Sequence, residues 1–140
     1  MATRDRRRYS AATIATIATT STSDAYVIAP VNGKLSEALF SAIDALAQHG
    51  SNYLTFSITN LGQAGAGTNA MLGAVDGNTT KTTTGAAIAA NTLRTLTLNT
   101  DASKRTVKKG DRLRIRATAT GTLANTVTGA NFLLTFDKEV

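Results

Sequence analysis

The sequence predicts an all-β fold, and three observations carry that prediction. Apolar side chains fall on every second residue from Leu113 to Ala119, and again in a run where Phe132, Leu134 and Phe136 share a face. A strand directs successive side chains to opposite faces, so this alternation is typical of half-buried antiparallel strands. Thr and Ala dominate much of the remainder, and the branched Cβ of Thr favours extended backbone. We expect the two alternating runs to pair in one sheet.

Length and composition limit the function classes. The 140 residues, 42% hydrophobic and 17% charged, fit one domain with a core of its own. Aromatic residues make up only 5% and Trp is absent, so the core must be mainly aliphatic. Cysteine is also absent, which excludes disulfides, thiolate metal sites and a Cys nucleophile. The net charge of +6 points to an anionic partner.

Much of the positive charge lies at the start of the chain. Arg4, Arg6, Arg7 and Arg8 form a basic cluster, followed by a Thr-rich repeat that contains Ile14 and Ile17. This stretch is either a mobile terminus or an arm that becomes ordered against a partner, where both isoleucines find contacts. We therefore expect an extended basic N-terminal arm over residues 1–23 and a globular β domain over residues 24–140. The Thr residues argue against a secretory signal, and no segment approaches the ~18 apolar residues of a membrane span.

Strands are expected in order along the domain. Residues 25–29 form the first, ended by the Pro30 to Gly33 turn, and residues 53–60 and 94–98 form others. The structure of residues 35–48 is left open between helix and strand. Taken alone, their apolar residues recur at helical spacing, and Gly50 stands where a helix would end. The tract from 61 to 90 is too long for a plain connection. We expect Met71, Leu72 and Val75 to anchor it, and Thr79 to Thr84 to be exposed.

No catalytic constellation emerges from the residues. The glycines at 62, 65 and 67 lack the Lys-Ser/Thr pair and the strand-loop-helix context of a phosphate loop. His49 is the single histidine and is expected at the surface, while the carboxylates are scattered singly. We therefore expect no enzyme, no bound metal and no cofactor.

An arginine row, defined as Arg112, Arg114 and Arg116, lies on one face of the strand that starts near residue 112. It is either a solvated outer face, a contact surface for an acidic neighbour or subunit, or a nucleic-acid site. Bidentate arginine suits carboxylates. Nucleic acid is the weaker reading, because single-strand binders interleave aromatic side chains and this row has none.

Several strings give the chain a family resemblance. Residues 67–72 (GTNAML), 87–98 (AIAANTLRTLTL), 107–116 (VKKGDRLRIR) and 121–123 (GTL), together with the opening 26–34 (YVIAPVNGK), resemble the capsid decoration, or cement, proteins of tailed bacteriophages. The resemblance covers roughly residues 25–137. It implies a β-sandwich of jelly-roll type assembled as a homotrimer on the outer capsid surface. It also favours a strand from Lys34 to about Ala42, with a helical turn after it, over the helix.

The resemblance defines the functional hypothesis. We expect a non-enzymatic structural virion protein that binds the major capsid protein and stabilises its lattice, with residues 4, 6, 7, 8, 14 and 17 binding capsid and the arginine row contacting a subunit or partner. No membrane is expected as a partner. The alternatives are a tail or fibre adsorption module that binds host glycan, and a nucleic-acid binder.

Overall fold

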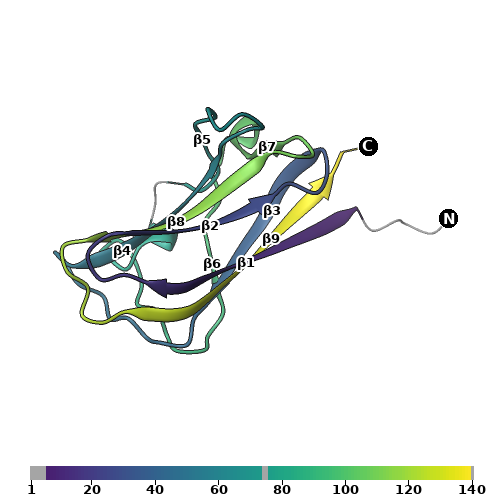
Figure 1. The fold of residues 1–140 in the computed structure, drawn as a ribbon. Helices are drawn as coiled ribbons and strands as arrows, with labels where there is room; N and C mark the ends of the chain where they lie inside the picture. The colour runs from purple at the N-terminus through teal and green to yellow at the C-terminus, as the bar shows by residue number, and fades with distance from the viewer. Residues whose placement is uncertain (1–5, 74–75, 140) are drawn as a thin grey trace.

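The computed structural model describes residues 6–73 and 76–139, and its strands form two antiparallel sheets (Figure 1). The strands are β1 (Arg7–Ile17), β2 (Thr22–Ile28), β3 (Gly33–Ser41), β4 (Tyr53–Asn60), β5 (Asn69–Ala70), β6 (Arg94–Thr95), β7 (Thr106–Val107), β8 (Arg112–Thr120) and β9 (Val127–Lys138). Two short 3-10 helices, η1 (Asp76–Asn78) and η2 (Ala102–Arg105), lie in the connections. The predicted all-β class is confirmed.

The strand order is that of a jelly roll. Sheet A has the order β1-β9-β3-β6, with β7 pairing the start of β3, and sheet B has the order β2-β8-β4-β5. The chain therefore passes repeatedly from one sheet to the other, and the first strand lies beside the last. Two packed antiparallel sheets with this interleaving define the jelly-roll sandwich, as expected from the resemblance.

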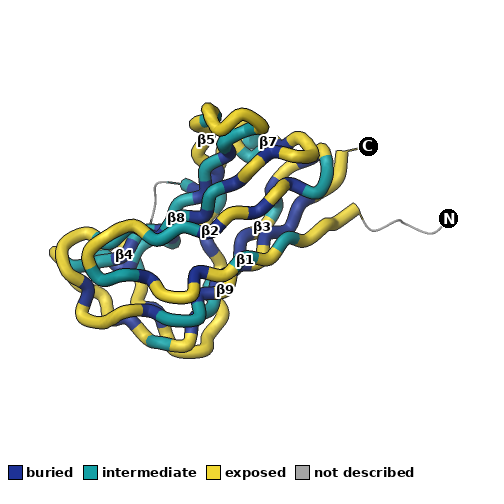
Figure 2. Tube along the Cα trace, viewed as in Figure 1, coloured by how far each residue is buried: buried dark blue, intermediate teal, exposed yellow. Residues whose placement is uncertain are grey.

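The core lies between the two sheets, and Figure 2 marks the buried positions along their strands. Alternate residues of β4, β8 and β9 point into it, among them Leu54, Phe56 and Ile58, each no more than 2% exposed. Phe56 meets Phe40 from β3 and Phe132 from β9, with ring centroids 4.7 and 5.9 Å away. Full burial of such side chains stabilises the fold by about 1.5–3 kcal/mol each. The expected inward faces of these strands are confirmed.

The expected pairing of the two alternating runs is wrong. The strand β8 pairs β2 and β4 in sheet B, whereas β9 pairs β1 and β3 in sheet A. Residues 121–126 carry the chain across the sandwich between them. Alternation fixes which face of a strand is buried but does not select its partner.

The division into an arm and a separate domain at residue 24 is wrong for residues 7–17. They form β1, an edge strand that pairs with β9 from Arg7↔Asp137 to Ile17↔Val127. Ile14 and Ile17 are 5% and 0% exposed and belong to the core. Small residues fill the positions between them, which masked the strand pattern in the sequence.

Of the two alternatives for residues 35–48, the helix is wrong. Residues 33–41 form β3, as the resemblance favoured, and residues 43–44 form a bend rather than a helical turn. A β-bulge between Leu35 and Glu37 shifts the register, so that Leu35 and Ala38 both face the core. A bulge adds one residue to one strand, and here it produces the three-residue spacing that imitates a helix.

The long tract is anchored more firmly than expected. Met71 and Leu72 are buried as predicted, while Val75 lies outside the described residues. Thr80 is fully buried, against the prediction, because its N–H donates to the Leu54 carbonyl and its Oγ1 accepts from the Leu54 N–H. The strand expected over 94–98 is shorter, at residues 94–95, although Leu96 is buried.

Candidate functional site

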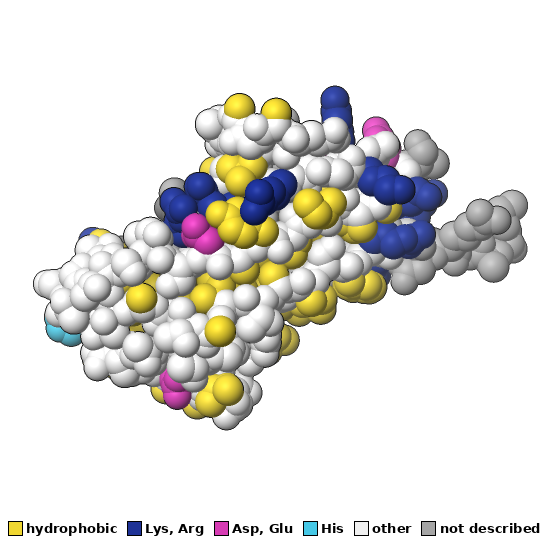
Figure 3. All heavy atoms as spheres, viewed as in Figure 1, with side chains coloured by type: hydrophobic (Ala, Val, Ile, Leu, Met, Phe, Trp, Pro, Cys, Tyr) yellow, Lys and Arg dark blue, Asp and Glu magenta, His cyan; other side chains and the backbone are white. Residues whose placement is uncertain are grey.

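One end of the sandwich collects most of the exposed positive charge. We define the basic end as Arg6, Arg7, Arg8, Lys34, Lys108, Lys109 and Lys138, all of them exposed. These residues come from the start of β1, the start of β3, the turn before β8 and the end of β9. Figure 3 shows Lys and Arg side chains gathered there. Asp137 and Glu139 lie among them, so the end is predominantly but not purely cationic.

Hydrogen bonds donated by backbone N–H groups hold these segments together. The Asn32 Oδ1 accepts from the Lys109 N–H at 2.9 Å, and the Asn32 carbonyl accepts from the Glu139 N–H at 2.7 Å. The Lys138 N–H donates to the Arg6 carbonyl at 2.8 Å. The lysines and arginines therefore project from a fixed framework.

Asp111 fixes the turn that carries two of the lysines. Its carboxylate is buried and accepts hydrogen bonds from the Lys108 N–H at 2.9 Å and from the Asn60 Nδ2 at 3.0 Å. Gly110 adopts a φ of +97°, which favours glycine. This turn leads directly into β8.

The structure separates the residues predicted to bind a capsid. Arg6, Arg7 and Arg8 lie exposed at the basic end, and Arg4 lies outside the described residues. Ile14 and Ile17 are not available to a partner, because they are buried between the sheets. Their prediction as contact residues is corrected accordingly.

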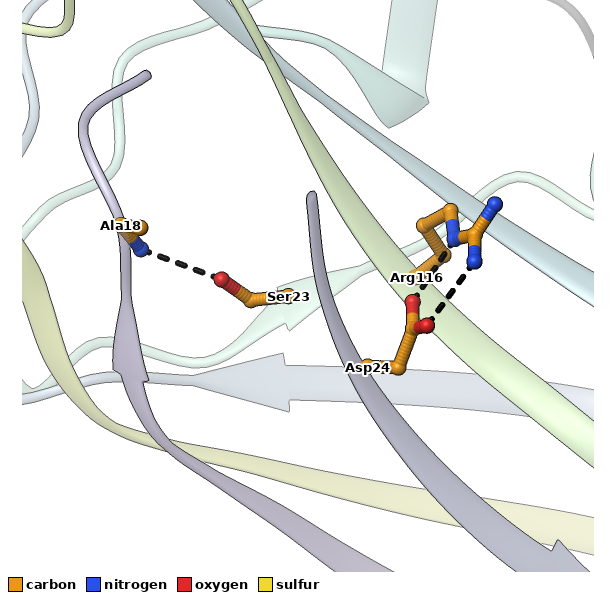
Figure 4. A network of polar contacts seen from close by, with 4 residues as sticks. All are labelled: Ala18, Ser23, Asp24 and Arg116. Carbon is orange, nitrogen blue, oxygen red and sulfur yellow. Dashed lines mark hydrogen bonds and ion pairs between the residues drawn. The ribbon is translucent and has the colours of Figure 1, made fainter. Parts of the chain in front are cut away.

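The second predicted surface, the arginine row, lies on the outer face of sheet B beside β2. Arg116 forms a bidentate pair with Asp24, with Nε–Oδ1 and Nη2–Oδ2 distances of 2.7 and 2.9 Å (Figure 4). The Arg116 hydrogen bond lowers the pKa of Asp24, and the same bond raises the pKa of Arg116. Ser23, next to Asp24, accepts a hydrogen bond from the Ala18 N–H and fixes the β1–β2 connection.

The other two members of the row are arranged differently. The Arg112 guanidinium stacks over the Tyr26 ring at 4.1 Å, a cation–π contact. Arg114 lies directly opposite Tyr26 in the register, and its Nε is inaccessible to solvent with no acceptor among the described residues. Sequence reasoning missed the roles of Asp24 and Tyr26. They alternate with buried residues along β2, but only the β2–β8 register shows which arginine each one meets.

An apolar strip crosses the outer face of sheet A. Ala11, Leu133 and Leu39 lie side by side on β1, β9 and β3. Tyr9, two residues before Ala11 on the same face, is 54% exposed. These side chains are available for contact with another surface.

The described residues offer no metal site. No group of three His, Asp or Glu side chains within them is arranged to hold a metal ion. His49 caps a turn, because its Nδ1 accepts from the N–H groups of Ser51 and Asn52 at 3.0 and 2.9 Å. A shallow hollow of about 160 Å³ lies beside it, lined partly by Leu46 and Thr122. No helix within residues 6–73 or 76–139 is long and apolar enough to cross a bilayer.

Comparison with known proteins supports the fold. No family model and no curated protein matches the chain. A solved structure of infectious bursal disease virus, Gx strain, matches with a TM-score of 0.51 at 15% identity over 95% of this chain. The match covers 33% of the viral chain, so this chain spans about a third of its length.

Two further structures have similar architecture. The cyanophage Pam1 capsid asymmetric unit matches at 16% identity and a TM-score of 0.48, over 95% of this chain and 85% of that one. A xylan-binding module, CBM15, matches at 13% identity and a TM-score of 0.46, over 89% of this chain and 78% of that one. At 15% identity, the likeness to the infectious bursal disease virus chain supports the fold alone, and a fold does not by itself define a function.

Proposed function

We propose that this chain is a structural virion protein, and more specifically a decoration protein that binds the outer surface of a phage capsid and stabilises the lattice of the major capsid protein. The sequence resemblance to capsid decoration proteins and the jelly-roll strand order support this proposal. The fold likeness to a chain of infectious bursal disease virus is consistent with it. No chemical reaction is part of the proposed role.

The observation that carries the docking step is the uneven distribution of charge. The basic end gathers seven of the Lys and Arg residues on exposed, hydrogen-bonded framework. A cationic surface of this kind is attracted to a carboxylate-rich one and accelerates encounter with it. We therefore propose that the basic end faces the capsid, with Arg6, Arg7 and Arg8 contacting acidic capsid residues.

Stabilisation follows from binding. A protein that binds only the assembled lattice stabilises that lattice by mass action. Each copy that spans a subunit boundary adds buried interface there. This role needs a rigid scaffold with surface contacts rather than reactive groups.

Homotrimer formation is part of the proposal. The apolar strip of Ala11, Leu133, Leu39 and Tyr9 on sheet A supports self-association, because burying exposed apolar area is favourable. Light scattering coupled to size-exclusion chromatography tests it. A mass three times the 14.5 kDa of one chain is expected, and the monomer mass at micromolar concentration contradicts this part of the proposal.

Reconstitution tests the docking step. Capsids that lack this chain are incubated with wild-type protein or with Arg6→Gln/Arg7→Gln/Arg8→Gln, and the bound copies are counted by cryo-electron microscopy and sedimentation. We expect the triple variant to bind roughly tenfold more weakly or worse, and wild-type binding to weaken with salt because exposed charges are screened. The single variant Arg6→Gln is compared with Lys81→Gln, which removes one positive charge away from the basic end.

Three results distinguish the candidates. Unchanged occupancy by the triple variant overturns docking through the basic end. Wild-type protein that binds no capsid overturns the decoration role. Density or labelling at the tail tip instead supports the adsorption module.

A further inference from the structure

We propose that the outer face of sheet B carries a second docking surface, which binds an extended acidic protein segment through Arg112 and Arg114. The surface, here named the β2–β8 patch, consists of Arg112, Arg114, Tyr26 and Ile28. It lies over the paired strands β2 and β8, where Figure 3 shows Lys and Arg side chains beside a carboxylate. This inference goes beyond the proposed capsid docking, which uses Arg6, Arg7 and Arg8.

The first argument is an imbalance of charge within the arginine row. Asp24 is bound by Arg116 through two hydrogen bonds. Among the described residues, neither Arg112 nor Arg114 forms an ion pair. The row therefore holds three guanidinium groups and one carboxylate, and two of the three are available to carboxylates from another molecule.

The second argument is the state of the Arg114 side chain. Its Nε has lost contact with solvent without gaining an acceptor within the described part of the chain. A donor that is closed to solvent is also closed to a ligand from outside, so the Nε itself does not bind the partner. The Nη atoms of Arg114 form no hydrogen bond within the described residues, and a carboxylate that binds them forms charge-assisted hydrogen bonds, which are the strong ones.

The third argument is that the patch is held in position before any partner arrives. Arg112 stacks on Tyr26 at 4.1 Å, and Tyr26 and Ile28 lie opposite Arg114 and Arg112 in the strand register. A guanidinium restrained by stacking loses less side-chain freedom when it binds.

The spacing of the two arginines defines the ligand. They are two residues apart on one strand and point to the same face, so their Cα atoms lie roughly 6.5–7 Å apart. An extended segment with acidic residues at positions i and i+2 has the same repeat. Ile28, which is 58% exposed, offers an apolar contact beside the second carboxylate.

These observations favour a protein over a nucleic acid. Arg112 covers the Tyr26 ring, so that face is closed to the base stacking that single-strand binders use.

The test uses the full chain and two fluorescein-labelled peptides of the same composition. In one peptide glutamates alternate with Val or Thr, and in the other the glutamates are adjacent in pairs. Fluorescence anisotropy at about 100 mM salt compares wild type, Arg112→Gln/Arg114→Gln, and the matched control Lys81→Gln/Lys104→Gln, which removes the same charge elsewhere. A single-stranded oligonucleotide and heparin serve as competing anions.

We expect the alternating peptide to bind several-fold more tightly than the paired one. The Arg112→Gln/Arg114→Gln variant should bind it roughly tenfold more weakly, and the lysine control should stay within twofold of wild type. In ¹⁵N spectra, the Arg114 Nε–Hε signal should shift when the alternating peptide is added.

Several results overturn the proposal. These are no peptide binding by wild type, equal loss in the lysine control, no preference between the peptides, or an unmoved Arg114 signal. Tighter binding of the oligonucleotide or heparin that depends on Arg112 and Arg114 overturns the protein partner in favour of that polyanion. Because the basic end is unaltered in these variants, the outcome is independent of capsid docking.

Discussion

Arg116 and Asp24 join β8 to the edge strand β2 through two parallel hydrogen bonds of 2.7 and 2.9 Å. Both side chains are partly exposed, at 31% and 22%. The pair therefore combines bidentate geometry with access to solvent, and we expect a modest contribution to stability.

Replacing Asp24 with Asn tests this pair through pH. The Arg116 hydrogen bond holds the pKa of Asp24 below its ordinary value of about 3.9. A carboxylate whose pKa is lower in the folded state stabilises the fold above its unfolded pKa, and this stabilisation is lost as pH falls toward the folded pKa. In urea titrations, Asp24→Asn should be less stable than wild type by about 0.5–1 kcal/mol at pH 7, and the gap should shrink below pH ~4.

Glu139→Gln serves as the control for that experiment, since it removes an exposed carboxylate at the end of the chain distant from Arg116 along the sequence. If the difference in unfolding free energy between wild type and Asp24→Asn stays constant from pH 7 to pH 2.5, the role of the ion pair is contradicted.

Truncating Ile17 tests whether β1 is integral to the sandwich. Ile17 is fully buried, so Ile17→Ala should lower the free energy of unfolding by about 2–5 kcal/mol through lost burial and a cavity. The neighbouring Thr16 is exposed, and Thr16→Ala should change the free energy of unfolding by less than about 0.5 kcal/mol. Removal of residues 1–22 should prevent stable folding, and a truncated chain that melts like wild type refutes this view of β1.

Phe132 offers a test of the core. Its ring lies 5.2 Å from that of Phe40 and 5.9 Å from that of Phe56, measured between centroids, so it links both sheets. We expect Phe132→Ala to destabilise the protein by about 3–5 kcal/mol. Leu133→Ala, on the outer face of the same strand, should cost far less, and equal losses in thermal melts contradict the assigned facing of β9.

Thr80→Val tests the link between the long tract and β4. The substitution keeps the shape but removes the Oγ1 that accepts the Leu54 N–H at 2.9 Å. A buried donor left unpaired costs about 1–3 kcal/mol. Thr82→Val, at an exposed position, is the control. Hydrogen exchange should accelerate at the Leu54 amide in the first variant only, and unchanged protection there argues against this bond.

The class of fold and the facing of the regular strands were predictable, because they depend on local alternation. Tyr53 to Asn60 forms a strand with the expected bounds. The β1 strand was not predictable in this way, since small residues such as Ala11 and Ala15 give little contrast between its faces. The bulge in β3 likewise converts a strand into a pattern of helical spacing.

The arginine row and the basic end could not be assigned from residue spacing alone. The arginine row is visible in the sequence, yet the division of its members into one paired with Asp24 and two without a carboxylate depends on the register of β2 against β8. That register is set by contacts across 92 residues of sequence. The basic end similarly arises from four segments that only the fold brings together.

The adjacency of β1 and β9 also bears on how the protein is made. Sheet A places β9 between β1 and β3, so its central strand is synthesised last of the nine. Until β9 is synthesised, β1 and β3 lack the strand that joins them, and their apolar faces are exposed to solvent. Such long-range closure is slow and leaves nascent chains open to aggregation, so chaperone demand during translation should fall mainly on the period before Val127 to Lys138 emerges.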